Sequence, residues 1–207
     1  MKDKFLTILI VVLSLALVGA SAAAEHDWVC VPGKRVGPIT RTTRASDLFK
    51  MFGKENVKRT IVELGEGATR PGTSTFPGTA NEISIPWKND KYQAPEMVII
   101  EKPGTKWKTS KNITIGTTLD GLVKINKRHF KLYGYAWDGA GLVTSWEKGE
   151  LERDHKIGER LAIQLGITRE VPWKDSEPVR SSQEFRSDNR TFAKLGLRVM
   201  TIKIMFP

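Results

Sequence analysis

The fold is decided by two adjoining stretches, ITIGTTLDGL (113–122) and FKLYGYAWDGAGLVTSW (130–146). In the first, Thr117 stands three residues before Asp120, which is the spacing of a helix capping box. Leu119, Leu122 and Val123 follow at helical spacing and give one apolar face. The first stretch therefore predicts a short helix that buries this face.

From Phe130 the apolar period changes to two, which is typical of a strand. One side of this strand would carry Phe130, Leu132 and Ala136, and the other would carry Tyr133, Tyr135 and Trp137. A strand with large side chains on both faces is usually central and covered on both sides. The glycines of DGAG (138–141) suit a turn, and the return strand runs from Leu142 through Val143 to Trp146.

The first 24 residues have the pattern of a signal peptide. Lys2 and Lys4 precede an apolar run (5–18) and a block of small residues that ends in AAA (22–24). We expect cleavage after Ala24, leaving 25–207 as a single exported domain in the periplasm or outside the cell. A retained anchor is the alternative, although the run is shorter than the roughly 20 apolar residues of a membrane span. No later segment is apolar enough to span.

The chain is basic, with a formal net charge of +10 at pH 7. Nucleic acid is the usual partner of such a chain, but export argues against it and the cations form no block of five or six. The expected partner is instead an envelope protein or an envelope polymer, of anionic character. Cys30 is the single cysteine, so no internal disulfide can form, and its position between Val29 and Val31 predicts a buried thiol.

An earlier segment, 39–64, has the same order of elements. Thr43 can cap a helix that ends at Gly53, and its apolar face comprises Ala45, Leu48, Phe49 and Phe52. A shift of 74 residues places Ile39 on Ile113, Thr43 on Thr117 and Leu48 on Leu122 without a gap. This predicts two helix–strand repeats (39–64 and 113–137) inside two half-repeats (33–103 and 107–207). Chance similarity at helix starts is the alternative.

The other strands complete an α+β fold, in which an antiparallel sheet carries two short helices. Strands are expected at 57–64, 73–76, 97–100 and 161–165. Ile83, Ile85 and Trp87 alternate with Ser84 and Pro86, which favours an edge strand because proline donates no ladder hydrogen bond. In the last strand Met200, Ile202, Ile204 and Phe206 should face inward, with Thr201 and Lys203 outward. Residues 166–197 are expected to form a long loop around Trp173 and Phe185.

These motifs carry a family resemblance. IxxGTTLxxL followed by FxLxGxxWDxxG and a tryptophan resembles a group of exported bacterial proteins of unknown function. More distantly, the doubled GTxxxL helix with its strands resembles β-lactamase-inhibitor-like modules and the small lipoproteins of outer-membrane assembly. The resemblance implies a binding protein rather than an enzyme. The chain departs from the inhibitors in having no disulfide and from the lipoproteins in having no lipobox, so no functional site carries over.

Residues with recognisable chemistry are few. His26, His129 and His155 lack the spacing of metal ligands, so neither a metal nor another cofactor is expected. Asp138 is the most interesting carboxylate, because it follows the aromatic strand and opens the glycine turn. Its ordinary role would be to hydrogen-bond its own backbone in that turn. A catalytic role would need a second carboxylate, for which Glu101 and Asp120 are the candidates.

Two classes of function therefore remain. The favoured hypothesis is a non-catalytic envelope module whose binding surface is an aromatic platform of Tyr133, Tyr135, Trp137 and Trp146. An aromatic stripe of this kind more often packs in the core. The alternative hypothesis is a hydrolase of envelope carbohydrate or peptide, using Asp138 and a second acid across a cleft.

Overall fold

The structure, a computed structural model, describes residues 26–136, 139–154 and 160–207. The fold is α+β, with antiparallel sheets and a few short helices, as the sequence predicts. In the part of the chain that is described, no helix is long and apolar enough to cross a membrane.

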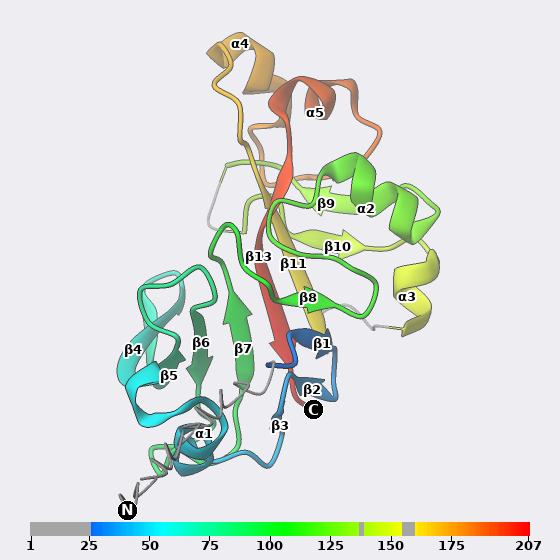
Figure 1. The fold of residues 1–207 in the computed structure, drawn as a ribbon. Coiled ribbons are helices and arrows are strands. Elements are labelled where there is room, and N and C mark those ends of the chain that lie inside the picture. The colour runs from blue at the N-terminus through cyan, green and yellow to red at the C-terminus, as the bar shows by residue number, and fades with distance from the viewer. Residues whose placement is uncertain (1–25, 137–138, 155–159) are drawn as a thin grey trace, which may run out of the picture.

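The main sheet has six strands in the order β11-β13-β7-β6-β5-β4, all paired antiparallel. Figure 1 shows β11 and β13 running together through the middle of the molecule, with β7, β6, β5 and β4 beside them. The bounds are β4 (Val57–Gly65), β5 (Ala68–Thr75), β6 (Ile83–Pro86), β7 (Met97–Ile100), β11 (Leu161–Gly166) and β13 (Arg198–Met205).

A three-stranded sheet continues from the β11 side. Its order is β10 (Val143–Ser145), β9 (Lys131–Tyr133) and β12 (Glu184–Arg186), so β9 is central, as predicted. Leu142 bridges to Gln164 of β11, and the Leu165 N–H donates to the Gly141 carbonyl at 2.9 Å. The two sheets are therefore joined through the glycine turn.

The predicted strand through Trp137 is shorter than expected, because β9 ends at Tyr133. Gly134 donates instead to the Gln183 carbonyl, and a Cβ at Gly134 would come within 2.5 Å of two carbonyl oxygens. Ala136, expected beside Phe130 and Leu132, is exposed.

A small third sheet holds the N-terminal part of the described chain. Its order is β3 (Ile39–Thr40), β2 (Arg35–Val36), β1 (Val29–Val31) and β8 (Lys108–Thr109), with β1 and β8 parallel. Cys30 lies in β1 and is fully buried, as predicted.

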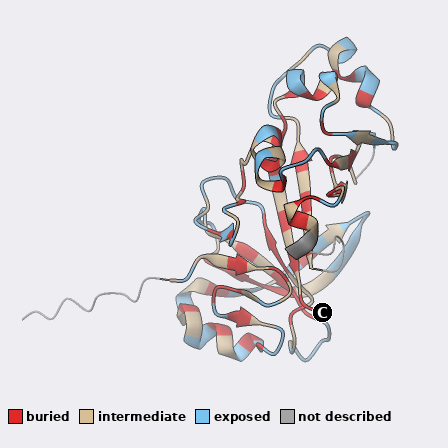
Figure 2. Ribbon diagram, turned by 90° about the vertical axis from the view of Figure 1, so that its right-hand side faces the viewer, coloured by how far each residue is buried: buried red, intermediate tan, exposed pale blue. Residues whose placement is uncertain are grey.

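The helices are short. They are α1 (Ala45–Phe52), α2 (Leu119–Asn126), α3 (Glu150–Asp154), α4 (Trp173–Ser176) and α5 (Arg190–Leu195), with 3₁₀ turns η1 (Lys54–Asn56) and η2 (Glu177–Val179). The predicted faces of α1 and α2 bury Ala45, Leu48, Phe52, Leu119 and Leu122, whereas Phe49 stays 41 % exposed. Figure 2 shows buried positions recurring along the central strands and on the inner sides of helices.

Both helices have their N-cap one residue later than predicted. The N-cap of α2 is Thr118, whose Oγ1 accepts from the Gly121 N–H at 3.0 Å. At α1 the N-cap is Arg44, and its N–H donates to the Asp47 carboxylate at 2.9 Å. Thr43 and Thr117 brace the preceding turn instead, accepting from the N–H groups of Thr40 (2.9 Å) and Thr114 (3.0 Å).

Thr43 and Thr117, which the 74-residue shift superimposes, make the same kind of contact, and the elements around them can be compared in the same way. Helices α1 and α2 have eight residues each and coincide under the 74-residue shift. The strands that follow both begin at the shifted position, but β4 has nine residues and β9 has three. The two segments share these element positions, and the predicted repeats and half-repeats remain predictions.

Three further expectations, two about the main sheet and one about residues 166–197, were wrong. Strand β6 is interior, between β5 and β7, and Pro86 is tolerated because its pairing with β7 covers only Ile83 and Ser84. Met200 is 40 % exposed because a bulge pairs Gln164 with Thr201 but Leu165 with Val199, which leaves Met200 as the extra residue. Residues 166–197 contain α4, η2, β12 and α5 rather than one loop around Trp173, which is 62 % exposed.

Candidate functional site

The predicted aromatic platform is divided by the fold. Trp146 is 1 % exposed and packs edge-on against Phe130, with ring centroids 5.0 Å apart, so it offers no surface to a partner. Tyr135 is half-buried; its hydroxyl donates to the Leu165 carbonyl at 3.1 Å, and burial raises the pKa of this hydroxyl. Tyr133 is partly exposed, and Trp137 and Asp138 lie outside the described residues.

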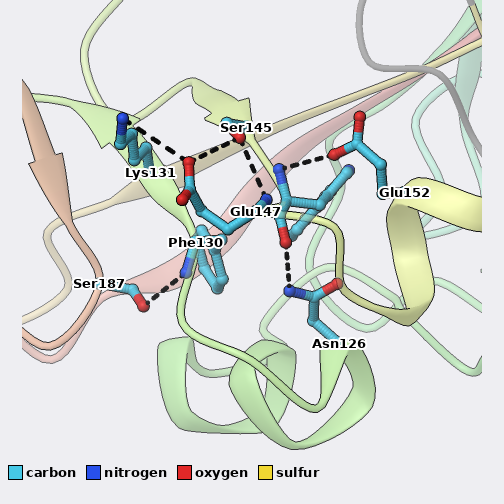
Figure 3. Close-up of polar contacts among 8 residues, drawn as sticks. Asn126, Phe130, Lys131, Ser145, Glu147, Glu152 and Ser187 are labelled. Carbon is cyan, nitrogen blue, oxygen red and sulfur yellow. Dashed lines mark hydrogen bonds and ion pairs between the residues drawn. The ribbon is translucent and has the colours of Figure 1, made fainter.

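A buried asparagine, Asn126, holds the main chain at Trp146, and Figure 3 shows its side chain below the turn that carries Glu147. The Asn126 side-chain amide donates to the carbonyls of Trp146 (2.9 Å) and Arg128 (3.0 Å), and its oxygen accepts from the Leu151 N–H at 3.0 Å. The Glu152 carboxylate accepts from the Trp146 N–H at 3.2 Å. Asn126 thus fixes α2, the end of the return strand and α3 against one another.

The turn after Trp146 is unusual in its backbone. Glu147 and Lys148 have φ angles of 53° and 59°, and the Gly149 N–H donates to the Trp146 carbonyl at 3.0 Å. Two consecutive left-handed residues are typical of a type I′ turn, in which asparagine and glycine are preferred. A hydrogen bond from Ser145, with Lys131 and Arg128 nearby, holds the pKa of the Glu147 carboxyl below its usual range.

The surface beside this turn carries charges of both signs. Arg128, His129, Glu147 and Arg186 line a shallow hollow of about 240 Å³. Glu147 pairs with Lys131 at 3.6 Å, and Arg186 pairs with Asp188 at 3.0 Å. Exposed pairs of this kind contribute little free energy. Two arginines and one glutamate line the hollow, so its lining carries a small excess of positive charge.

A better-formed site lies on the face of the main sheet that carries the side chains of Ala162, Thr201 and Lys203. It is a groove of about 290 Å³ with a predominantly apolar lining, formed by Leu64, Gly65, Glu66, Gly139, Leu142, Ala162, Gln164, Thr201 and Lys203. Three parts of the chain meet there: the tip of the β4–β5 hairpin, the glycine turn after β9, and strands β11 and β13.

Curvature of the sheet creates the groove. The Lys203 ammonium of β13 donates to the Leu64 carbonyl of β4 at 3.4 Å. Three strands separate β13 from β4, so in a flat sheet they would lie about 19 Å apart at the usual strand spacing. The sheet therefore curls toward the face that carries the groove. The side chains of Val62 and Ile99 are buried by this curl, with exposed fractions of 5 % and 3 %.

Gly72 permits part of this curl. It lies opposite Thr60 on β4, and a Cβ at Gly72 would come within 2.3 Å of the Val62 side chain. A larger residue would push β4 away from β5, and the hairpin tip would then move from its position over the groove.

Lys203 is the cation of the groove. Across the ladders it is flanked by Ala162 of β11 and Ile99 of β7. Within the described chain its ammonium has the Leu64 carbonyl as its hydrogen-bond partner and no carboxylate within ion-pair distance. An apolar hollow with a few convergent polar groups is the usual form of a small-ligand site. Here the polar side chains of the lining are those of Lys203, Gln164, Thr201 and Glu66.

Glu101 and Asp120, the candidate second carboxylates, lie in different parts of the fold. Glu101 follows β7 directly and accepts from the Thr201 hydroxyl at 3.3 Å. Asp120 lies in the first turn of α2, beside Arg169 and Arg198. Among the described residues, no three His, Cys, Asp or Glu side chains gather as a metal site would require.

Sequence reasoning missed Lys203 as a site residue. It correctly placed the lysine on the outward side of the last strand. The contact between Lys203 and Leu64, however, depends on how far the sheet curls across the four strand pairings from β13 to β4. A lysine inside an otherwise apolar strand (TIKIM, 201–205) was the available signal. Gly139 was predicted as a turn residue and Leu142 as the first residue of the return strand, and both contribute to the groove.

Comparisons with family models, with curated proteins and with solved structures found no match for this chain.

Proposed function

We propose that this chain is an exported, non-catalytic binding module of the cell envelope, and that its site is the groove around Lys203. Residues 1–24 would be its signal peptide, and 25–207 the exported domain. The observation that carries the binding proposal is the pairing of an apolar groove with one ammonium that has no carboxylate partner among the described residues.

The ligand that fits this chemistry has an apolar body and an anionic end. The apolar lining from Leu64, Leu142 and Ala162 removes hydrocarbon from water, which is favourable in proportion to the area buried. The Lys203 ammonium still has donors for a carboxylate or phosphate, and such charge-assisted hydrogen bonds are stronger than neutral ones. The full chain has a net charge of +10, and removal of Lys2, Asp3 and Lys4 with the signal peptide would leave +9. This charge would also attract an anionic protein segment or polymer of the envelope.

Calorimetric titration with decanoate and with decanol tests the site. The two probes share an apolar chain and differ in the charged end. We expect saturable binding of decanoate by the wild type, and a loss of at least tenfold in affinity for decanol or for the Lys203→Met variant.

The matched control is Lys102→Met, since Lys102 is an exposed lysine paired with Glu82 at 3.9 Å, outside the groove lining. This variant should bind decanoate as the wild type does, provided that both variants keep the wild-type unfolding midpoint. Equal binding of decanoate by Lys203→Met and wild type, or no saturable binding at all, would contradict the proposal.

A further inference from the structure

Strand β4 presents a long outer edge. It has nine residues and is the last strand of the six-stranded sheet. Edge strands of this length offer unpaired N–H and C=O groups to another strand, and many proteins protect them with charge. Three side chains on one face of β4, those of Arg59, Ile61 and Glu63, are exposed, Ile61 by 63 %.

The pairing of β4 with β5 determines which backbone groups point outward. The Phe76 N–H donates to the Asn56 carbonyl at 2.7 Å, and the next pair along is Val57 with Thr75. Hydrogen-bonded and non-hydrogen-bonded pairs alternate in an antiparallel ladder. Arg59, Ile61 and Glu63 therefore fall at non-hydrogen-bonded positions, so their N–H and C=O groups point to the open edge.

Proline at position 71 agrees with this assignment. Pro71 is the residue opposite Ile61. Because proline has no N–H to donate, it fits a position that is not hydrogen-bonded to β4.

We propose that β4 is a self-association edge, at which it pairs antiparallel with β4 of a second copy about a two-fold axis through Ile61. Ile61 then lies opposite Ile61 of the second copy. Arg59 lies opposite Glu63 of the second copy, and the reverse pair forms on the other side of the axis. Opposite charges placed directly across an antiparallel pair stabilise it.

Other registers lose this complementarity. An axis through Thr60 would place Arg59 opposite Ile61 and Val57 opposite Glu63. An axis through Val62 would place Ile61 opposite Glu63. Of these three axes, only the one through Ile61 forms both Arg59–Glu63 pairs and the Ile61–Ile61 pair. In this register the outward N–H and C=O groups of one strand also face those of the other. Such an edge is smaller than a standard interface, so the dimer should be weak and concentration-dependent.

Sedimentation analysis of the full chain across about 1–500 µM, the range of a weak dimer, tests the proposal. Arg59→Glu and Glu63→Arg should each weaken self-association at least tenfold, since each places like charges opposite one another. The double variant should restore it to within about threefold of wild type, because exchanging the charges recreates both pairs.

Lys58→Glu is the matched control, since it makes the same charge change on the other face of β4 and Lys58 lies at a hydrogen-bonded position. It should leave the dimer unchanged. A second measurement uses oxidation of Ile61→Cys, which should link two chains, because Cα atoms of such a pair lie within disulfide range. A chain that stays monomeric throughout this range would overturn the proposal. So would single reversals without effect, or a double variant that is not restored.

Discussion

The Asn126 side-chain amide donates to the main-chain carbonyl of Trp146 at 2.9 Å, although twenty residues separate them. Asn126 is fully buried. Through this one side chain the end of α2 is held against the turn that begins α3, and the position of Trp146 in the core depends on it.

Asn126→Ala should therefore lower the free energy of unfolding by about 2–4 kcal/mol, because it leaves the carbonyls of Trp146 and Arg128 and the Leu151 N–H unpaired in or near the core. Denaturant unfolding measures this change. Lys124→Ala, at an exposed position on the same helix, is the control and should change stability by only a few tenths of a kcal/mol. An equal effect of the two variants would show that the buried amide contributes nothing.

Leu122→Ala should lower the free energy of unfolding by about 2–5 kcal/mol, the usual range for a buried leucine. Its counterpart under the 74-residue shift, Leu48, is equally buried, so Leu48→Ala should cost a similar amount. Phe49→Ala should cost less, since Phe49 is 41 % exposed. A change below about 1 kcal/mol at either leucine would contradict burial of that helix face.

Cys30 should react slowly with thiol reagents in the native protein and rapidly after unfolding. Burial raises the pKa of its thiol from 9.0 to about 12, so little thiolate exists at neutral pH. Rapid stoichiometric labelling of the folded chain would refute this.

The same shift makes stability depend on pH. Between pH 9 and 12 the folded state keeps a proton that the unfolded thiol releases, so this contribution to stability is complete below pH 9 and declines above it. Cys30→Ala should show a shallower decline than wild type in denaturant midpoints measured from pH 8 to 10.5. Parallel declines for the two proteins would contradict the raised pKa.

Tyr135→Ala should destabilise the protein by about 2–4 kcal/mol, near the lower end for aromatic truncation because Tyr135 is only half-buried. Tyr135→Phe should cost about 1 kcal/mol, the net contribution of one hydrogen bond, here to the Leu165 carbonyl. In a spectrophotometric titration, Tyr135→Phe should also remove one tyrosine ionisation whose pKa is raised by burial. An unchanged unfolding midpoint for Tyr135→Ala would instead favour the platform hypothesis.

The sequence predicted the parts of the fold that depend on local pattern. Helices α1 and α2, strand β7 and the buried Cys30 follow from apolar periodicity and neighbouring residues. The predicted alternation of inward and outward side chains along β13 is wrong at Met200. A bulge against β11 inserts an extra residue there, and the sequence of β13 alone does not predict that bulge. Pro86 suggested that β6 is an edge strand, but β6 is interior, and its pairing with β7 ends at Ser84, before Pro86 is reached.

The site was harder to predict than the fold. The aromatic side chains were conspicuous in sequence, yet Trp146 packs in the core against Phe130. Lys203 was ordinary in sequence, and its setting arises when the curled sheet brings Leu64 within 3.4 Å. Lys203 and Leu64 are far apart in the chain, and they meet only because the twists between several neighbouring strands add up. No local sequence pattern could therefore reveal this contact.

Strand β13 has a consequence for the order of assembly. It follows every other strand in the chain, yet it lies between β11 and β7 and joins them. Because β13 separates β11 from β7, these two strands do not pair with each other, and the six-stranded sheet is incomplete until β13 has been synthesised. The native sheet can form only in one late step, when β13 inserts between them, and pairings with large sequence separation of this kind are slow.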